Sequence, residues 1–167
     1  LVETEGRRLL YDAGPSYGSE SEAGSRVIIP YLQARGLKRI DALIVSHQDS
    51  DHAGGAREVI RRLKPAWVSS SIAAGFQGVQ HVPCREGQSW QWGQAGWRFF
   101  HPAEVNMTAV KSSTNARSCV LHLSHPAVSV LFPGDLEKAQ ERRLVSDYGA
   151  KALHADVLIA PHHGSAG

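Results

Sequence analysis

Residues 46–55 read SHQDSDHAGG, which places two histidines and two acids within six positions and then ends in two glycines. The carboxylates of Asp49 and Asp51 repel one another, and neither they nor His47 and His52 suit an apolar core. A bound cation would offset that repulsion. The stretch follows IDALIV, a continuous apolar run typical of a strand that is covered on both faces. We therefore predict a cation site at the carboxyl end of a buried strand.

The bulk composition is that of an ordinary globular domain. The chain has 167 residues, of which 42% are hydrophobic and 20% charged, and its formal net charge is +2. This length fits one domain, 1–167, and no apolar run reaches the roughly 18 residues of a membrane span. The net charge is too small to indicate nucleic-acid binding by itself. Because the chain starts at Leu1 and stops in a Gly-Ser loop, we expect it to be a piece of a longer one.

Two cysteines, Cys84 and Cys119, lie far apart in the sequence. Neither belongs to a C-x-x-C pair, so they indicate neither a zinc knuckle nor a disulfide framework. We expect buried or free thiols, and these leave the redox compartment open.

The hydrophobic pattern predicts strands and helices that alternate in the first half of the chain and antiparallel hairpins in the second. The first half predicts a hairpin over 1–14, helices over 25–37 and 56–64, and strands over 40–46 and 66–71. The second half predicts hairpins over 89–100 and 118–135, a helix over 136–149 and a buried strand over 155–165. Mixed sheets with helices on their outer faces follow from this order, which is an α/β (α+β) fold.

Further candidate ligands follow two later strands. Asp135 comes directly after Gly134 at the end of the strand SVLFPGD, and His162 and His163 follow ADVLIAP. Two cations about 3.5–4 Å apart need a carboxylate that bridges them, and Asp135 is the candidate. Imidazole and carboxylate donors without a thiolate suit Zn²⁺ and are compatible with Mn²⁺. The residues therefore predict a site for two divalent metal ions.

A surface loop or a helix N-cap is the rival interpretation, with Asp51 capping a helix that starts after Gly55. Four such residues in six positions, matched later by PHHGS, favour metal binding. Other polar and aromatic residues are assigned structural roles: loop or solvent positions for His101, His122 and His125, packing for Trp90, Trp92 and Trp97, a solvated helix end for Arg61, Arg62 and Lys64, and a turn for Asp12 and Gly14. For the tryptophans and for the basic run, contact with nucleic acid is the minority alternative.

The motifs carry a resemblance to a known family. SHQDSDHAGG resembles the H-x-H-x-D-H signature of the metallo-β-lactamase superfamily, with Asp49 at the place of the second histidine, and FPGD and PHHGS resemble later motifs. Together with GRRLLYDAGP, TNARSCVL and ADVLIAPHHGS, the set is similar to the carboxy-terminal domain of the ComEC family, inner-membrane DNA-uptake channels of competent bacteria. The similarity covers nearly the whole chain.

The resemblance implies a metallo-β-lactamase-like αββα sandwich of two mixed sheets, truncated at its carboxyl end, with the metals at one edge. His47 and Asp49 would hold one metal, Asp51 and His52 the other, and Asp135 would bridge them. His162 or His163 would be a further ligand, for which His163 is our candidate, or a proton donor, so Asp51, His162 and His163 are the candidate catalytic residues. Many members have another histidine where Asn115 and Ser118 stand here. We therefore expect the metals to bind weakly or to be absent in this fragment.

The function that the resemblance implies is metal-dependent hydrolysis of DNA, as a nuclease that degrades one strand during uptake in natural transformation. The partners would be DNA, as single strand or duplex, and the membrane channel portion of the same longer chain. The chain would be a soluble domain of a bacterial inner-membrane protein, on a side of the membrane that the residues do not indicate. Two alternatives stay open: a hydrolase of small esters or lactams, and a non-catalytic module that binds DNA or a partner through a degenerate metal site.

Overall fold

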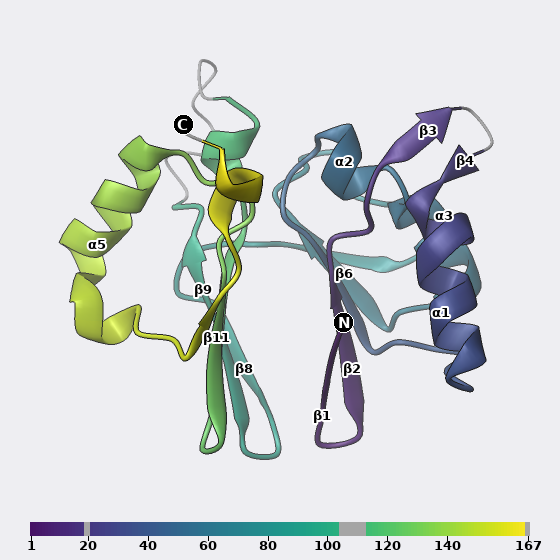
Figure 1. The fold of residues 1–167 in the computed structure, drawn as a ribbon, viewed down its shortest axis with the longest axis horizontal. Helices are drawn as coiled ribbons and strands as arrows, with labels where there is room; N and C mark the ends of the chain where they lie inside the picture. Colours follow the sequence, from purple (N-terminus) through teal and green to yellow (C-terminus); the bar gives the residue numbers. More distant parts are fainter. Residues whose placement is uncertain (19–20, 104–112, 166–167) are drawn as a thin grey trace. The chain divides into compact units, whose positions relative to one another are not determined.

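The computed structural model describes residues 1–18, 21–103 and 113–165. The chain divides into two compact units, Leu1–Pro83 and Cys84–Gly167. Each unit contains one five-stranded mixed sheet with helices (Figure 1). The predicted fold class, mixed sheets that carry helices, is confirmed.

The sheet of the first unit is parallel except at one edge. Its order is β1-β2-β5-β6-β7, where β1 pairs antiparallel with β2 and every other pair is parallel. The strands are β1 (Val2–Thr4), β2 (Arg7–Tyr11), β5 (Ala42–Val45), β6 (Trp67–Ser70) and β7 (Gln80–Pro83). The short pair β3 (Ser16–Gly18) and β4 (Ser21–Glu22) follows β2. The predicted hairpin at the start of the chain is confirmed.

Helices pack against this sheet through one apolar core. They are the π-helical turn η1 (Gly24–Ile28), α1 (Ile29–Ala34), α2 (Ser50–Ala53) and α3 (Ala56–Leu63), of which η1 and α1 both contact α3. Leu32 of α1 and Val59 of α3 are buried with Leu43 and Val68 of the sheet. The predicted helices are confirmed in position, and α2 was not foreseen. Lys64 ends α3 in the left-handed region at φ 45°, just before Pro65, which disfavours helical geometry in the preceding residue.

Strand β5 lies in the middle of the sheet, and its four residues are all 0% exposed. This agrees with the continuous apolar run from which a doubly covered strand was predicted. Because β2, β5 and β6 are parallel, their carboxyl ends lie at one edge of the sheet. The residues that follow those ends, above all Asp12 and Ser46, therefore come close together.

The second unit is built from antiparallel hairpins. Its order is β12-β11-β10-β9-β8, and only β11 and β12 are parallel. The elements are β8 (Ser89–Trp92), β9 (Ala95–His101), η2 (Asn115–Arg117), β10 (Val120–His125), β11 (Val128–Phe132), α5 (Lys138–Ala152), β12 (Val157–Leu158) and η3 (Pro161–Gly164). Leu144 of α5 packs with Phe100 and Val120 of the sheet. Both predicted hairpins and the helix are confirmed.

The prediction of a buried strand over 155–165 is wrong. Only Val157 and Leu158 are in strand β12, and these residues are 44% and 59% exposed. The physical reason is position, since β12 lies at the edge of the sheet and pairs only with β11 among the described strands. An apolar run indicates burial only where neighbouring layers exist on both sides.

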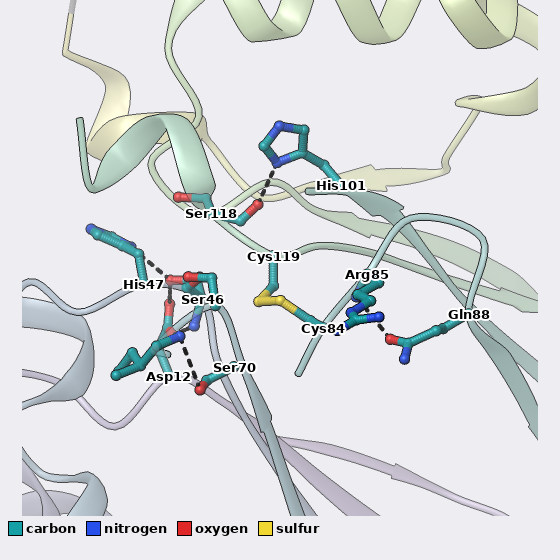
Figure 2. Close-up of a disulfide and its surroundings, with 12 residues drawn as sticks. Asp12, Ser46, His47, Ser70, Cys84, Arg85, Gln88, His101, Ser118 and Cys119 are labelled. Atoms are coloured by element: carbon teal, nitrogen blue, oxygen red, sulfur yellow. Dashed lines mark hydrogen bonds between the residues drawn. A yellow bond between two sulfur atoms is a disulfide. The ribbon is translucent and has the colours of Figure 1, made fainter. Parts of the chain in front are cut away.

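The prediction of free thiols is also wrong, because Cys84 and Cys119 form a disulfide with their Cα atoms 6.0 Å apart (Figure 2). The two residues are separated by 35 positions, but both lie beside the end of β9. The N–H of Glu86 donates to the carbonyl of Pro102, and Val120 is the strand partner of His101. The chain therefore brings together two cysteines that the sequence keeps far apart.

Candidate metal centre

The candidate ligands of the first unit lie beside the carboxyl ends of β2 and β5. Tyr11 and Ile44 are register partners, so Asp12 and Ser46 leave the sheet side by side. The Ser46 N–H donates to Asp12 Oδ1 at 2.7 Å, and the Ser46 hydroxyl donates to Asp12 Oδ2 at 2.9 Å. Asp12 has φ 60°, a left-handed conformation that aspartate tolerates better than most residues. The turn thus aims a carboxylate at the loop after β5.

Two histidines of that loop are held by their Nδ1 atoms. His52 Nδ1 lies 2.8 Å from Asp12 Oδ2, and His47 Nδ1 lies 3.0 Å from Ser46 Oγ. Figure 2 shows the interactions that join Asp12, Ser46 and His47. Since the serine proton goes to Asp12, both imidazoles donate from Nδ1, and each Nε2 keeps its lone pair. Such carboxylate–histidine contacts orient the imidazole ligands of metal sites.

Each Nε2 atom faces a carboxylate of the same loop. His47 Nε2 lies 3.5 Å from Asp49 Oδ2, and His52 Nε2 lies 3.6 Å from Asp51 Oδ2. These separations exceed the usual N–H···O range of about 2.7–3.2 Å. They match two ligands of one ion, because donors 2.0–2.2 Å from a tetrahedral cation lie about 3.3–3.6 Å apart. The donor set therefore fits divalent metal ions.

The helix-cap interpretation of the acids is wrong. Asp49 is the N-cap residue of α2, but its side chain makes no capping hydrogen bond. Gly55, not Asp51, is the N-cap residue of α3. Both acids are substantially exposed, at 41% and 52% of their side chains, so they are accessible to an ion.

The paired glycines allow two loops to pack backbone against backbone. A Cβ atom on Gly54 would lie 2.2 Å from the nitrogen of Ser16, and one on Gly55 would lie 2.3 Å from the carbonyl oxygen of Ala13. The Ala13 N–H donates to the carbonyl of His52 at 2.9 Å. Side chains at 54 and 55 would force apart the turn that carries Asp12 and the loop that carries His52.

The second unit places Asp135 against the loop that contains His163. Asp135 follows Gly134, whose φ of 60° turns the chain, and its N–H donates to Ser118 Oγ at 3.1 Å. The N–H of His162 donates to the carbonyl of Gly134 at 3.2 Å. His163 Nε2 lies 3.5 Å from Asp135 Oδ2, close to the 3.5 and 3.6 Å of the two pairs in the first unit.

The two histidines of the second unit differ in their surroundings. Both have left-handed backbones, with φ 48° for His162 and φ 53° for His163, which cost about 1–3 kcal/mol each. Strain of this kind is characteristic of functional sites. His162 Nε2 lies 3.5 Å from Asn115 Nδ2, and its Nδ1 has no hydrogen-bond partner within the described residues. Of the two, His163 reaches the Asp135 carboxylate.

Three residues that the sequence interpretation set aside support the candidate ligands. Asp12 was assigned to a turn, yet it also orients His52 and Ser46. Ser118 was noted only because it stands where many family members have a histidine, yet its hydroxyl accepts the Asp135 N–H. The sequence did contain a signal for the role of Asp12, because this acid directly follows β2, a strand parallel to β5, and the loop after β5 carries candidate ligands.

His101 was taken for a loop residue, but it is the buried last residue of β9 and donates from Nδ1 to the Ser118 carbonyl at 2.8 Å (Figure 2). Burial lowers the pKa of His101, which favours the neutral ring.

The fold and these donors define a class of protein. The family model for the metallo-beta-lactamase superfamily matches residues 1–167, and the chain belongs to that superfamily. Among solved structures, Rm3 metallo-beta-lactamase shares the fold with a TM-score of 0.62 at 16% identity, over 90% of this chain and 66% of that one.

Within the superfamily the chain is similar to competence proteins. It is 34% identical over 165 residues to competence protein ComA of Neisseria gonorrhoeae, which covers 99% of this chain and 22% of that protein. It is 32% identical to recombination protein 2 of Haemophilus influenzae, over 99% of this chain and 20% of that protein. The chain therefore spans about a fifth of these relatives' length. In the described part of the chain, no helix has the length and hydropathy to cross a membrane.

Proposed function

We propose that the chain is a metal-dependent phosphodiesterase that acts on DNA. The observation that supports this most is a repeated geometry, in which an imidazole Nε2 lies 3.5–3.6 Å from a carboxylate oxygen three times. The proposed metal ligands are the six residues of these pairs: His47, Asp49, Asp51, His52, Asp135 and His163. We propose further that residues 1–167 are a single metallo-β-lactamase-like domain.

The donors are nitrogen and oxygen atoms, which suit Zn²⁺ and Mn²⁺. Two such ions would supply a nucleophile from water near neutral pH and would stabilise negative charge on a phosphodiester. Asp12 and Ser46 keep the imidazoles of His52 and His47 in the tautomer that ligates. Asp51 would bind a metal ion beside His52. His162, held in a strained loop with an unpartnered Nδ1 among the described atoms, would donate a proton to the leaving oxygen.

The choice of DNA rests on the relatives, whose names refer to competence and recombination. The proposed task is degradation of one strand while the other is taken up through a channel formed by further parts of a longer chain. This assignment is finer than superfamily membership, because the metallo-β-lactamase fold also serves other hydrolytic reactions.

Metal analysis combined with turnover assays tests the proposal. The purified protein is loaded with Mn²⁺ or Zn²⁺, the bound metal is measured, and single-stranded DNA, duplex DNA and small esters are offered as substrates. We expect DNA cleavage that is abolished by His52→Ala and by His163→Ala, while His125→Ala in the β10–β11 hairpin retains it. Turnover of esters alone would favour the small-ester hydrolase, and bound metal without any turnover would favour a binding module.

A further inference from the structure

A groove of about 1110 Å³ lies within the first unit, next to the proposed metal-binding loop. Its lining includes Gln48, the residue between His47 and Asp49. One wall is α3, and the other is the segment 72–79 that follows β6. The groove therefore connects with the loop that carries four of the proposed ligands.

Cations line the α3 wall of this groove. Arg57, Arg61 and Lys64 have the spacing i, i+4, i+7, which places them on one face of the helix and its C-terminal end. Successive cations are separated along the axis by about 6 and 4.5 Å. Arg61 is paired with Glu58, whereas Arg57 and Lys64 form no ion pair with any described residue. Two of the three charges are thus available to an anion.

Apolar side chains form much of the remaining lining of the groove, together with Gln48 and Gln77. Ile60, Ile72, Phe76 and Val79 all line the groove, and each is packed against the core while part of its surface stays exposed. A helix end that only meets water is expected to carry polar side chains. Here exposed apolar surface lies beside the unpaired cations instead. A ligand with an anionic backbone and flat apolar groups complements both walls.

We propose that this groove binds a single-stranded nucleic acid, with phosphates at Arg57, Arg61 and Lys64 and an unstacked base against Phe76. A single strand exposes the faces of its bases, which stack on aromatic side chains, while a duplex hides them. The inference that the groove guides the strand towards the metal-binding loop at Gln48 rests on the proposed nuclease function. Strand binding itself does not depend on that function.

Binding is measured without metal, so that cleavage plays no part. Fluorescence anisotropy of a labelled oligothymidylate is recorded in EDTA over a range of salt concentrations for the 167-residue protein. Each phosphate contact adds about −0.7 to the slope of log K against log salt, so three contacts predict a slope of about −2. Arg57→Gln with Lys64→Gln should bring the slope to about −0.7 and weaken binding at least ten-fold.

The matched control is Arg62→Gln with Lys38→Gln, which removes two exposed charges that do not line the groove. This control should bind like the wild type. Phe76→Leu keeps apolar bulk but removes the aromatic face, and it should weaken binding about ten-fold without changing the salt slope. Equal losses in the control and the groove variant would overturn the proposal, as would equal affinity for a duplex of the same length.

A cleavage assay in Mn²⁺ separates this proposal from the proposed function. If the wild type binds the strand through the groove but cleaves nothing, the groove proposal stands and the nuclease proposal fails. If the wild type cleaves single strands and the Arg57→Gln/Lys64→Gln variant has the same KM and kcat, the nuclease proposal stands and the groove proposal fails.

Discussion

Asp12 Oδ2 lies 2.8 Å from Nδ1 of His52, although 40 positions separate the two residues in the sequence. The contact joins the carboxyl ends of two parallel strands, β2 and β5, through their register. It fixes the proton of His52 on Nδ1 and leaves Nε2 to face Asp51. The metal affinity of the proposed site therefore depends on a residue that is not itself a proposed ligand.

Asp12→Asn should weaken metal binding about 10–100-fold, as loss of such supporting contacts does elsewhere. The Asn amide oxygen can keep the Ser46 N–H that Asp12 Oδ1 accepts now, which leaves the amide nitrogen in the place of Oδ2. Because this nitrogen can only donate, it opposes the His52 Nδ1 proton and favours the tautomer that cannot ligate through Nε2. Calorimetric titration of Zn²⁺ and Mn²⁺ measures the change. Asp41→Asn is the matched control, because this carboxylate holds Arg7 and the Arg8 N–H elsewhere in the same unit. Unchanged affinity in Asp12→Asn would contradict the positioning role.

Asp51→Ala should abolish metal binding and activity while the protein stays folded. Asp49 and Asp51 stand two positions apart in the same loop, so their negative charges repel one another when no metal is bound, and removing one carboxylate relieves that repulsion. We expect thermal unfolding in EDTA to occur at the wild-type temperature or slightly above. If the variant unfolds while the wild type stripped of metal remains folded, Asp51 has a structural role and the ligand assignment is wrong.

Gly54→Ala should destabilise the first unit by about 1–3 kcal/mol, because the new Cβ would overlap backbone atoms that cannot move independently. The nearest are the nitrogen of Ser16 at 2.2 Å and the carbonyl oxygen of Ser50 at 2.5 Å. Urea unfolding measures the loss, and metal titration should show weaker binding, since the Asp12 turn is displaced. A variant with wild-type stability and affinity would show that the loops separate at no cost.

The sequence was sufficient to predict most of the strands and helices because each is signalled locally, whereas α2 and β7 were not foreseen. The six metal ligands remain a proposal. A continuous apolar run predicted β5, alternation predicted the hairpins, and clustered acids and histidines marked the loop after β5. Motif resemblance led to the correct superfamily.

The sequence was insufficient wherever a role depends on contacts between distant segments. Asp12 acts through the register of two strands, and the Cys84–Cys119 disulfide forms because both residues lie beside the end of β9. The burial of His101 similarly requires β10 as a neighbour. Propensity and spacing carry no information about such pairings, which arise only when the sheet is assembled.

Reduction of the Cys84–Cys119 disulfide should destabilise the second unit. A loop of 35 residues corresponds to about 4 kcal/mol in the chain-entropy model. Guanidinium unfolding with and without a reductant measures the difference, and Cys84→Ser/Cys119→Ser should match the reduced protein. Metal affinity should also fall, because Cys119 adjoins Ser118, whose hydroxyl accepts the Asp135 N–H. Two titratable thiols in protein purified under oxidising conditions would contradict the disulfide.

Stability of the metal-free protein should fall as the pH drops below about 6.5, in part because of His101. Burial lowers the pKa of His101 from its ordinary value of 6.5, so between the ordinary and the lowered value the unfolded chain binds more protons than the folded one. The loss therefore begins near pH 6.5 and is complete below the native pKa. Burial also lowers the pKa of His81, which contributes with the same sign.

His101→Asn isolates the contribution of one ring, since the amide retains an N–H for the Ser118 carbonyl but does not titrate. Chemical unfolding in EDTA at pH 7.5 and pH 5 gives the pH dependence of each protein. The variant should lose less stability than the wild type between these values. An identical pH dependence in His101→Asn and the wild type would mean that the buried ring accepts its proton as readily in the folded chain as in the unfolded one.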